Sequence, residues 1–246
     1  MTPASLNIMW STARSEAALE AALPAPIDIR PMRSARRLRL RFDEARGTFK
    51  LTCPWRTSRR AALAWAADQR DWIEAQLARA GADEPFETGA LILIEGEEVR
   101  IVWSAAALRT PVLDGDEVVV GGPEAGVARR VELFLKRHAL DVMSREVAEY
   151  SSLAGVTATS VSVGDAGTRW GSCSSSGRIR LSWRLILAPR EVRRYVVAHE
   201  VAHLVHLDHS PNFKALEARL YGPGLSEAKA TLRRLGPRLR RLGRGR

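Results

Sequence analysis

The pentapeptide His199-Glu200-Val201-Ala202-His203 places two imidazoles and one carboxylate within five residues. On an α-helix, histidines four residues apart lie on one face, about 6 Å from each other, so both rings can reach one cation. Glu200 lies about 100° further round the helix, where its carboxylate can contact a water molecule that the cation activates. The spacing predicts metal-dependent hydrolysis, with His199 and His203 as metal ligands and Glu200 as general base.

The residues around this pentapeptide predict a buried helix that spans residues 189–207. Beyond its first turns the helix is apolar on all sides, apart from His199, Glu200, His203 and His206. Polar groups inside a core cost several kcal/mol unless they are partnered, and a bound metal ion would partner them. The alternative is that His199 and His203 are hydrogen-bonded core histidines.

A hydrolytic zinc site needs a third protein ligand and one open position. We expect His209 in this role, because Ser210 and Pro211 end the helix and a chain that reverses there returns His209 to the metal. His206 shares the helical face, but three histidines in a row span about 10 Å and do not converge on one ion. Two downstream carboxylates are less favoured third ligands: Glu217 and Glu227. Imidazole-rich sites accept several divalent ions, of which Zn²⁺ is the expected one.

Hydrophobic periodicity and turn residues predict an α+β protein in three parts. Residues 1–26 form a loosely ordered leader, and residues 27–122 form a β-rich N-terminal unit with one packed helix at about 57–80. Residues 123–246 form a second unit that ends in a basic helix. The expected strands lie at residues 37–42, 48–53, 90–94, 99–103, 118–120, 159–163, 168–173 and 178–183, and a long helix lies at 125–153.

Composition and charge limit the cellular location and the partners that we expect for this protein. The 246 residues are 46% apolar and contain two cysteines, and no apolar run approaches the roughly 18–20 residues that span a bilayer. We therefore expect a cytoplasmic protein without membrane association. The formal charge of +10 makes polyanions plausible partners by long-range attraction. Arginines cluster at residues 30–41 and 233–246, where the alternative is an ordinary solvated surface.

Four segments of the second unit resemble one known family. They are Arg169-Trp170-Gly171-Ser172-Cys173, residues 183–189, residues 199–203, and His209-Ser210-Pro211-Asn212-Phe213. The chain is similar, most densely over residues 168–220, to the YgjP-like metallopeptidases, which are related to the SprT and WLM zinc proteases. The resemblance implies a compact zincin-like second unit and zinc-dependent cleavage of polypeptides.

Further side chains are candidates for contacts with the substrate or with an anionic intermediate. Arg169, Arg184 and Tyr195 are candidate donors to the intermediate, and Trp170 either contacts the substrate or fills the core.

Two alternative functions also fit the sequence. One is a metal-dependent hydrolase of nucleotides or other phosphorylated small molecules, because an activated water molecule also attacks phosphorus. The other is a nucleic-acid-associated protease that is tethered through its Arg-rich tail, residues 233–246.

Overall fold

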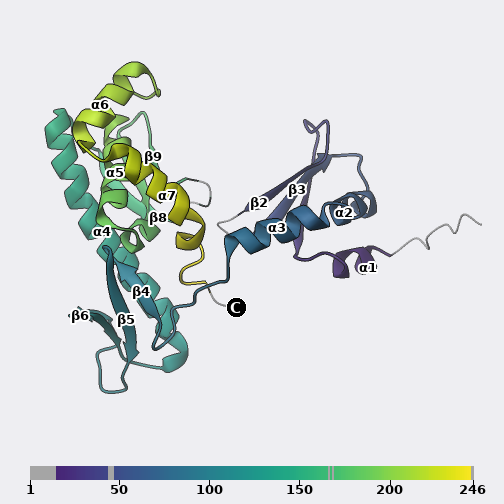
Figure 1. Cartoon of the computed structure of the whole chain (residues 1–246), viewed down its shortest axis with the longest axis horizontal. Coiled ribbons are helices and arrows are strands. Elements are labelled where there is room, and N and C mark those ends of the chain that lie inside the picture. The colour runs from purple at the N-terminus through teal and green to yellow at the C-terminus, as the bar shows by residue number, and fades with distance from the viewer. Residues whose placement is uncertain (1–14, 44–46, 166, 168, 245–246) are drawn as a thin grey trace, which may run out of the picture. The chain divides into compact units, whose positions relative to one another are not determined.

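The computed structural model of the chain describes residues 15–43, 47–165, 167 and 169–244. These residues form helices and three small mixed sheets (Figure 1), which confirms the predicted α+β class. They divide into two compact units, an N-terminal unit that ends at residue 78 and a C-terminal unit from residue 79 onward. Among the described residues, no helix is both long and apolar enough to cross a bilayer.

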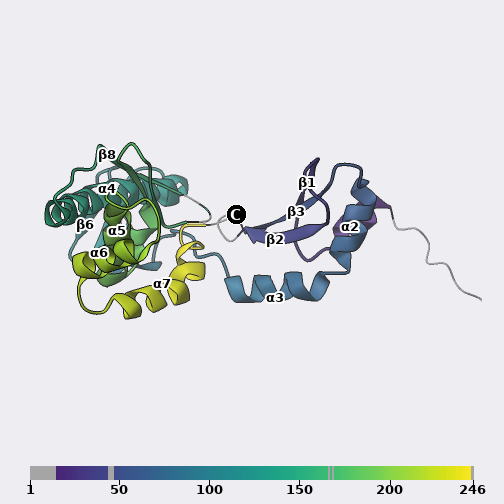
Figure 2. The same cartoon turned by 90° about the horizontal axis from the view of Figure 1, so that it is seen from above.

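The N-terminal unit is a three-stranded sheet with helices packed on one face (Figure 2). Its elements are α1 (Glu16–Ala21), β1 (Ile27–Met32), β2 (Arg39–Asp43), β3 (Thr48–Pro54), α2 (Arg59–Ala67) and all but the last two residues of α3 (Arg70–Ala80). The central strand β3 is parallel to β1 and antiparallel to β2. Its side chains alternate between buried and half-buried. On the buried face Leu51 packs with Ala62 and Ala66 of α2, and the ring centroid of Phe49 lies 5.9 Å from that of Trp72 in α3.

Two predictions for this part of the chain need correction. The single helix expected at residues 57–80 is two helices, because the N–H of Gln69 bonds to the carbonyl of Ala66, three residues back, and ends the α-helical pattern. The leader expected at residues 1–26 contains α1, whose N-cap Ser15 accepts a hydrogen bond from the N–H of Ala18. Residues 1–14 of that leader lie outside the described residues.

In its described residues, the C-terminal unit combines two sheets with four α-helices. Its first half contains β4 (Leu91–Ile94), β5 (Glu97–Trp103), β6 (Val112–Asp114), β7 (Glu117–Val120), the 3₁₀ turn η1 (Glu124–Gly126) and α4 (Val127–Ala154). Its second half contains β8 (Ser160–Gly164), β9 (Gly171–Cys173), β10 (Arg178–Ser182), η2 (Trp183–Leu187), α5 (Arg190–Ala202), α6 (Pro211–Tyr221) and α7 (Leu225–Leu239). The strand orders are β4-β5-β7-β6 and β8-β10-β9.

One core joins both sheets to the helices of this unit. Ile101 of β5 and Val118 of β7 share it with Leu135 of α4 and with Val197 of α5, and all four are fully buried. For this reason strands β4 to β7 belong to the C-terminal unit, whereas the sequence-based division placed them before a boundary at residue 122. The core therefore fixes α5, which carries the candidate site, from several sides.

The helix α5 is shorter than predicted. It ends at Ala202 instead of continuing to residue 207, because the N–H of Leu204 bonds to the carbonyl of Val201, three residues back. Beyond this turn Val205 and Leu207 are exposed instead of buried. The chain thus leaves the helical path directly after His203, and it starts α6 at Pro211 behind the N-cap Ser210, as expected.

Candidate metal centre

Three imidazoles gather where α5 ends and α6 begins. The ring centroids of His199 and His203, one helical turn apart, are separated by 4.8 Å. The ring of His209, which the turn brings back, lies 5.3 Å from His199 and 4.8 Å from His203. One nitrogen from each of the three rings lies within 4.8 Å of the others. Nitrogens gathered this closely could act together as ligands of one divalent cation.

Hydrogen bonds orient two of these rings for metal binding. Nδ1 of His203 lies 2.9 Å from the carbonyl oxygen of His206, which can only accept, so Nδ1 carries the proton and leaves Nε2 free as a ligand atom. Nδ1 of His199 lies 2.8 Å from Oε1 of Glu217, which orients this ring in the same way. Such outer hydrogen bonds are typical of histidines that bind metals. The donor set and its orientation therefore fit a divalent cation.

The outer carboxylate, Glu217 of α6, is almost completely buried. Its second oxygen, Oε2, forms an ion pair at 2.8 Å with Nζ of Lys229 in α7. Although burial raises the pKa of Glu217, hydrogen bonds from His199 and Lys229 bring it below its ordinary value. Within the described part of the chain, neither Glu217 nor the exposed Glu227 joins the three histidines as a ligand.

Glu200 is buried next to this cluster, against the edge strand β9. At Gly171 of β9 an added Cβ would collide with the carboxylate of Glu200, so only glycine permits this close approach. Burial raises the pKa of Glu200 to about 7, and the positive charges of His199 and Arg169 partly oppose the rise. A carboxylate with a pKa near neutrality is suited to accept and return protons.

The remaining candidate residues have different surroundings. The ring of Tyr195 lies 6.1 Å from that of His199, and burial, with the nearby Glu217 and Glu200, raises the pKa of Tyr195 to about 12. Arg169 is exposed and close enough to lower the pKa of Glu200.

Trp170 and Arg184 are engaged in packing. The ring of Trp170 lies beside Gly236 of α7 and 4.5 Å from the guanidinium of Arg240. The buried guanidinium of Arg184 pairs with Asp165 at 3.1 Å and donates to the carbonyls of Leu239, the last residue of α7, and of Leu242 beyond it. A substrate role for any of these four candidates stays a prediction.

The sequence assigned no role to two contributors to the centre, Phe213 and Lys229. The ring centroid of Phe213 lies 4.4 to 5.1 Å from all three imidazoles and forms one wall of the cluster. Lys229 lies 30 residues beyond His199, and no local pattern marks it. The sequence feature that could have indicated Phe213 is its place in the first turn of the helix that starts at Pro211, close to His209.

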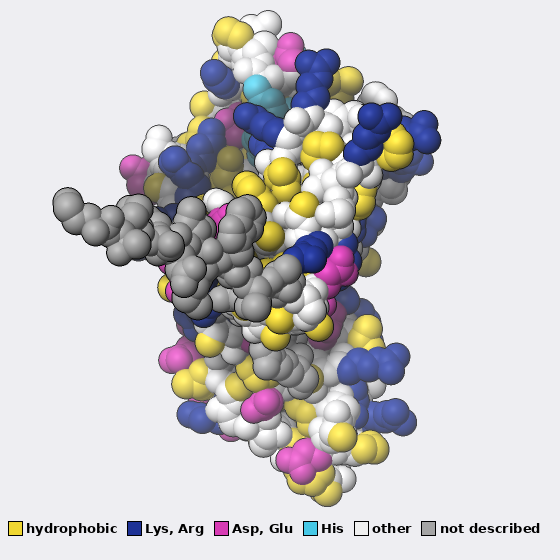
Figure 3. Space-filling view, turned by 90° about the vertical axis from the view of Figure 1, so that its right-hand side faces the viewer, with side chains coloured by type: hydrophobic (Ala, Val, Ile, Leu, Met, Phe, Trp, Pro, Cys, Tyr) yellow, Lys and Arg dark blue, Asp and Glu magenta, His cyan; other side chains and the backbone are white. Residues whose placement is uncertain are grey.

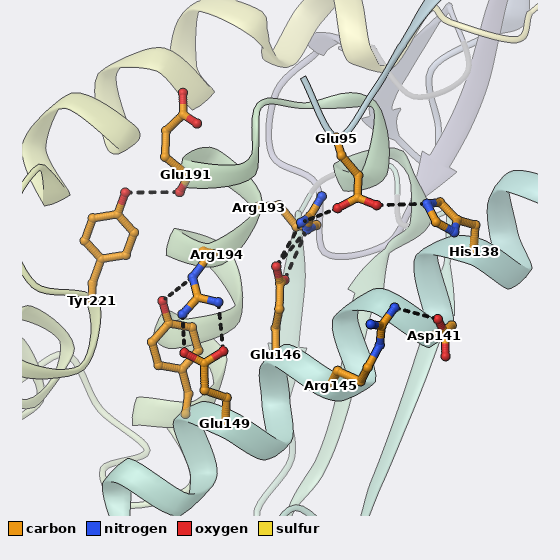
Figure 4. Close-up of polar contacts among 11 residues, drawn as sticks. Glu95, His138, Asp141, Arg145, Glu146, Glu149, Glu191, Arg193, Arg194 and Tyr221 are labelled. Carbon is orange, nitrogen blue, oxygen red and sulfur yellow. Dashed lines mark hydrogen bonds and ion pairs between the residues drawn. The ribbon is translucent and has the colours of Figure 1, made fainter. Parts of the chain in front are cut away.

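A second polar cluster fixes α5 upstream of the histidines (Figure 4). The buried guanidinium of Arg193 forms hydrogen bonds of 2.9 to 3.1 Å with Glu146 of α4. It also pairs at 3.0 Å with Glu95 in the turn between β4 and β5, and Glu95 in turn contacts Nε2 of His138. These contacts tie the metal-site helix to α4 and to the first sheet of the same unit.

Comparison with known proteins agrees with this geometry. The model of the family described as YgjP-like, metallopeptidase domain, matches residues 36–235. No curated protein and no solved structure matches the chain. The family match covers most of the chain, including all three clustered histidines and Glu200. The chain therefore belongs to the YgjP-like metallopeptidase family.

Proposed function

We propose that this metallopeptidase uses Zn²⁺, held by His199, His203 and His209, and that Glu200 is its general base. The observation that carries the proposal is the convergence of three imidazoles, two of them with Nδ1 already engaged, beside a buried carboxylate. Three protein ligands leave one coordination position for water or substrate, as in catalytic and unlike structural zinc sites.

The chemistry divides between the ion and the chain. When bound, the ion polarises a peptide carbonyl and lowers the pKa of a water molecule toward about 7. Glu200 accepts the proton of the attacking water on a carboxylate oxygen and later delivers it to the nitrogen of the leaving amine. The phenol of Tyr195, which stays protonated at neutral pH, and the guanidinium of Arg169 are the proposed donors to the anionic intermediate.

Metal content tests the ligand assignment. We expect the purified chain to carry about one zinc ion and the His203→Ala variant to lose it, because two imidazoles hold the ion far more weakly than three. His206→Ala is the matched control, because His206 contacts His203 through its backbone carbonyl, which the substitution keeps. Elemental analysis after dialysis measures both variants. Retention of zinc by His203→Ala, or its loss from His206→Ala alone, would contradict the assignment.

Parallel assays test the reaction class. The zinc-loaded chain should cleave an unfolded polypeptide, and removal of zinc with a chelator should stop the cleavage until zinc is restored. Nucleoside triphosphates, assayed under the same conditions, are the discriminating substrates. Turnover of triphosphates without cleavage of polypeptide would replace the proposed peptidase chemistry by phosphate-ester hydrolysis.

Glu217→Gln should weaken zinc binding by about 10- to 100-fold, the usual effect of losing an outer-shell partner. The amide keeps the size of the side chain but loses the charge that orients and polarises His199 and that pairs with Lys229. Competition with a zinc-binding dye measures the affinity directly and does not depend on turnover. Glu227→Gln removes an exposed carboxylate from α7 and should leave the affinity unchanged. Equal affinities for the two variants would assign Glu217 a packing role only.

A further inference from the structure

The many arginines of the chain do not by themselves mark a binding site. Lys and Arg side chains are dispersed over the face drawn in Figure 3 and are mixed with acidic and hydrophobic ones. In the tail, Arg238 pairs with Glu84 and Arg241 with Asp83, while Arg240 stacks on Trp170. These guanidiniums help to hold the end of the chain in place. Arginines that are exposed and have no acidic partner are therefore the informative ones.

Such arginines gather on the open face of the N-terminal sheet. Residues that pair directly across strands point to the same face, and β3 buries its Phe49, Leu51 and Cys53 on the other face. On the open face, Thr52 of β3 lies between Arg30 and Arg39, and Lys50 lies between Asp28 and Arg41. Each of the three strands thus contributes at least one cation to this face.

The cations on β2 differ from those on the other two strands. Arg30 is paired with Asp28 at 2.8 Å, and Lys50 with Asp43 at 2.5 Å. Arg39 and Arg41 are exposed, and no described residue forms an ion pair with either. The strand β2 is an edge strand, so no further strand of the described sheet lies beyond this cationic row.

One end of the same sheet adds an exposed indole with two guanidiniums nearby. Because β1 and β3 are parallel and end at paired residues, the chain segments that follow them lie at the same end. Trp55, which follows β3, has 55% of its surface exposed. The guanidiniums of Arg33 and Arg56 lie 5.9 and 5.0 Å from its ring centroid. Arg36 and Arg37, also exposed, lie in the connection from this end to β2.

We propose that this basic face, made of Arg33, Arg36, Arg37, Arg39, Arg41 and Trp55, binds single-stranded nucleic acid. Guanidiniums form paired hydrogen bonds with phosphate oxygens, and an exposed indole offers a flat surface on which an unpaired base stacks. A row of cations beside an aromatic platform is the arrangement that single strands require.

An anionic membrane is the competing partner for a cationic face. A surface that inserts into a membrane presents a continuous apolar face, from which side chains enter the acyl region, whereas purely electrostatic attachment to headgroups makes no use of an exposed indole. Among the described residues, the large apolar side chains exposed near these cations are Trp55 and Met32, and the two do not form such a face. The observations therefore favour a nucleic acid.

The test measures binding of the full chain to fluorescent oligo(dT) and oligo(rU) over a series of salt concentrations. Each phosphate contact on a single strand adds about 0.7 to the slope of log affinity against log salt. Substitution of Arg37, Arg39 and Arg41 by Ser should therefore lower that slope by about 2. The control has the same change in charge in the C-terminal unit, with Ser at the exposed Arg129, Arg137 and Arg219, and should keep the slope. Circular dichroism checks that both triple variants are folded.

Trp55→Ala separates stacking from charge. It should lower the affinity by about 5- to 150-fold, the range measured for loss of one base-stacking side chain, with an unchanged salt slope. Trp55→Phe should restore most of the affinity. Failure of the native chain to bind either oligonucleotide would overturn the proposal. Equal salt slopes for the two triple variants would also overturn it. So would a result in which the chain binds anionic vesicles but neither oligonucleotide, and in which this vesicle binding depends on Trp55.

Discussion

Glu200→Gln should lower peptide hydrolysis by about 10²- to 10⁴-fold, the contribution of a well-placed general base. The amide has nearly the size of the carboxylate, so it occupies the space that the absence of a side chain at Gly171 leaves for Glu200. It does not accept a proton at neutral pH, so the water molecule loses its base. Zinc content should stay unchanged, because Glu200 is not among the clustered ligands.

The control for Glu200→Gln is Glu191→Gln on the same helix. Glu191 is exposed, and its described hydrogen bond, from the hydroxyl of Tyr221, is made to its backbone carbonyl. This control should keep full activity. The measurement is the initial rate of cleavage of an unfolded polypeptide by zinc-loaded samples of known metal content. If Glu200→Gln retained its zinc and cleaved at the native rate, the assigned general base would be wrong.

Local sequence patterns predicted most of the elements that position the site. The strand expected at residues 48–53 is β3, and the helix expected at 125–153 is α4, each within a few residues of its observed bounds. The prediction that His199, His203 and His209 come together agrees with their observed cluster. This agreement has a local cause, because helical spacing and the Ser210-Pro211 start of α6 together restrict where the third ring can lie.

What sequence reasoning missed depends on contacts between distant segments. The partner of His199 is Glu217, and the partner of Glu217 is Lys229, so this chain of contacts requires α6 and α7 to pack on α5. The residues are 18 and 30 positions from His199, and no local periodicity links them. The early end of α5 was missed for a related reason, because Val205 and Leu207 suggested continued burial while the turn after His203 exposes them.

Arg193 shows the same limit at the start of α5. The sequence places it among the polar first turns of the helix, which suggests contact with solvent. In the structure it is 1% exposed, because Glu146 and Glu95, from segments 47 and 98 residues away, surround its guanidinium (Figure 4). A buried arginine needs such partners, and their presence cannot be read from the helix alone.

Glu146→Ala should destabilise the C-terminal unit by about 3–5 kcal/mol, because it leaves the buried charge of Arg193 without its main partner. The melting temperature of the C-terminal unit should therefore fall by roughly 6–20 °C, at about 2–4 °C per kcal/mol for a unit of this size. The matched control is Glu149→Ala, one turn further along α4. Glu149 also pairs with an arginine, Arg194, but its side chain is half exposed, and loss of such a pair costs at most about 1 kcal/mol.

The double variant Glu146→Met/Arg193→Met separates loss of an ion pair from loss of packing. It removes both charges and fills their space with apolar atoms, which often restores stability when a buried ion pair is replaced. We therefore expect its melting temperature to lie above that of Glu146→Ala and close to the native value. Thermal unfolding followed by circular dichroism compares all of these variants. If Glu146→Ala melted like Glu149→Ala, the pair with Arg193 would not be what holds α5 against α4, and the packing of Val197 and its neighbours would have to do so alone.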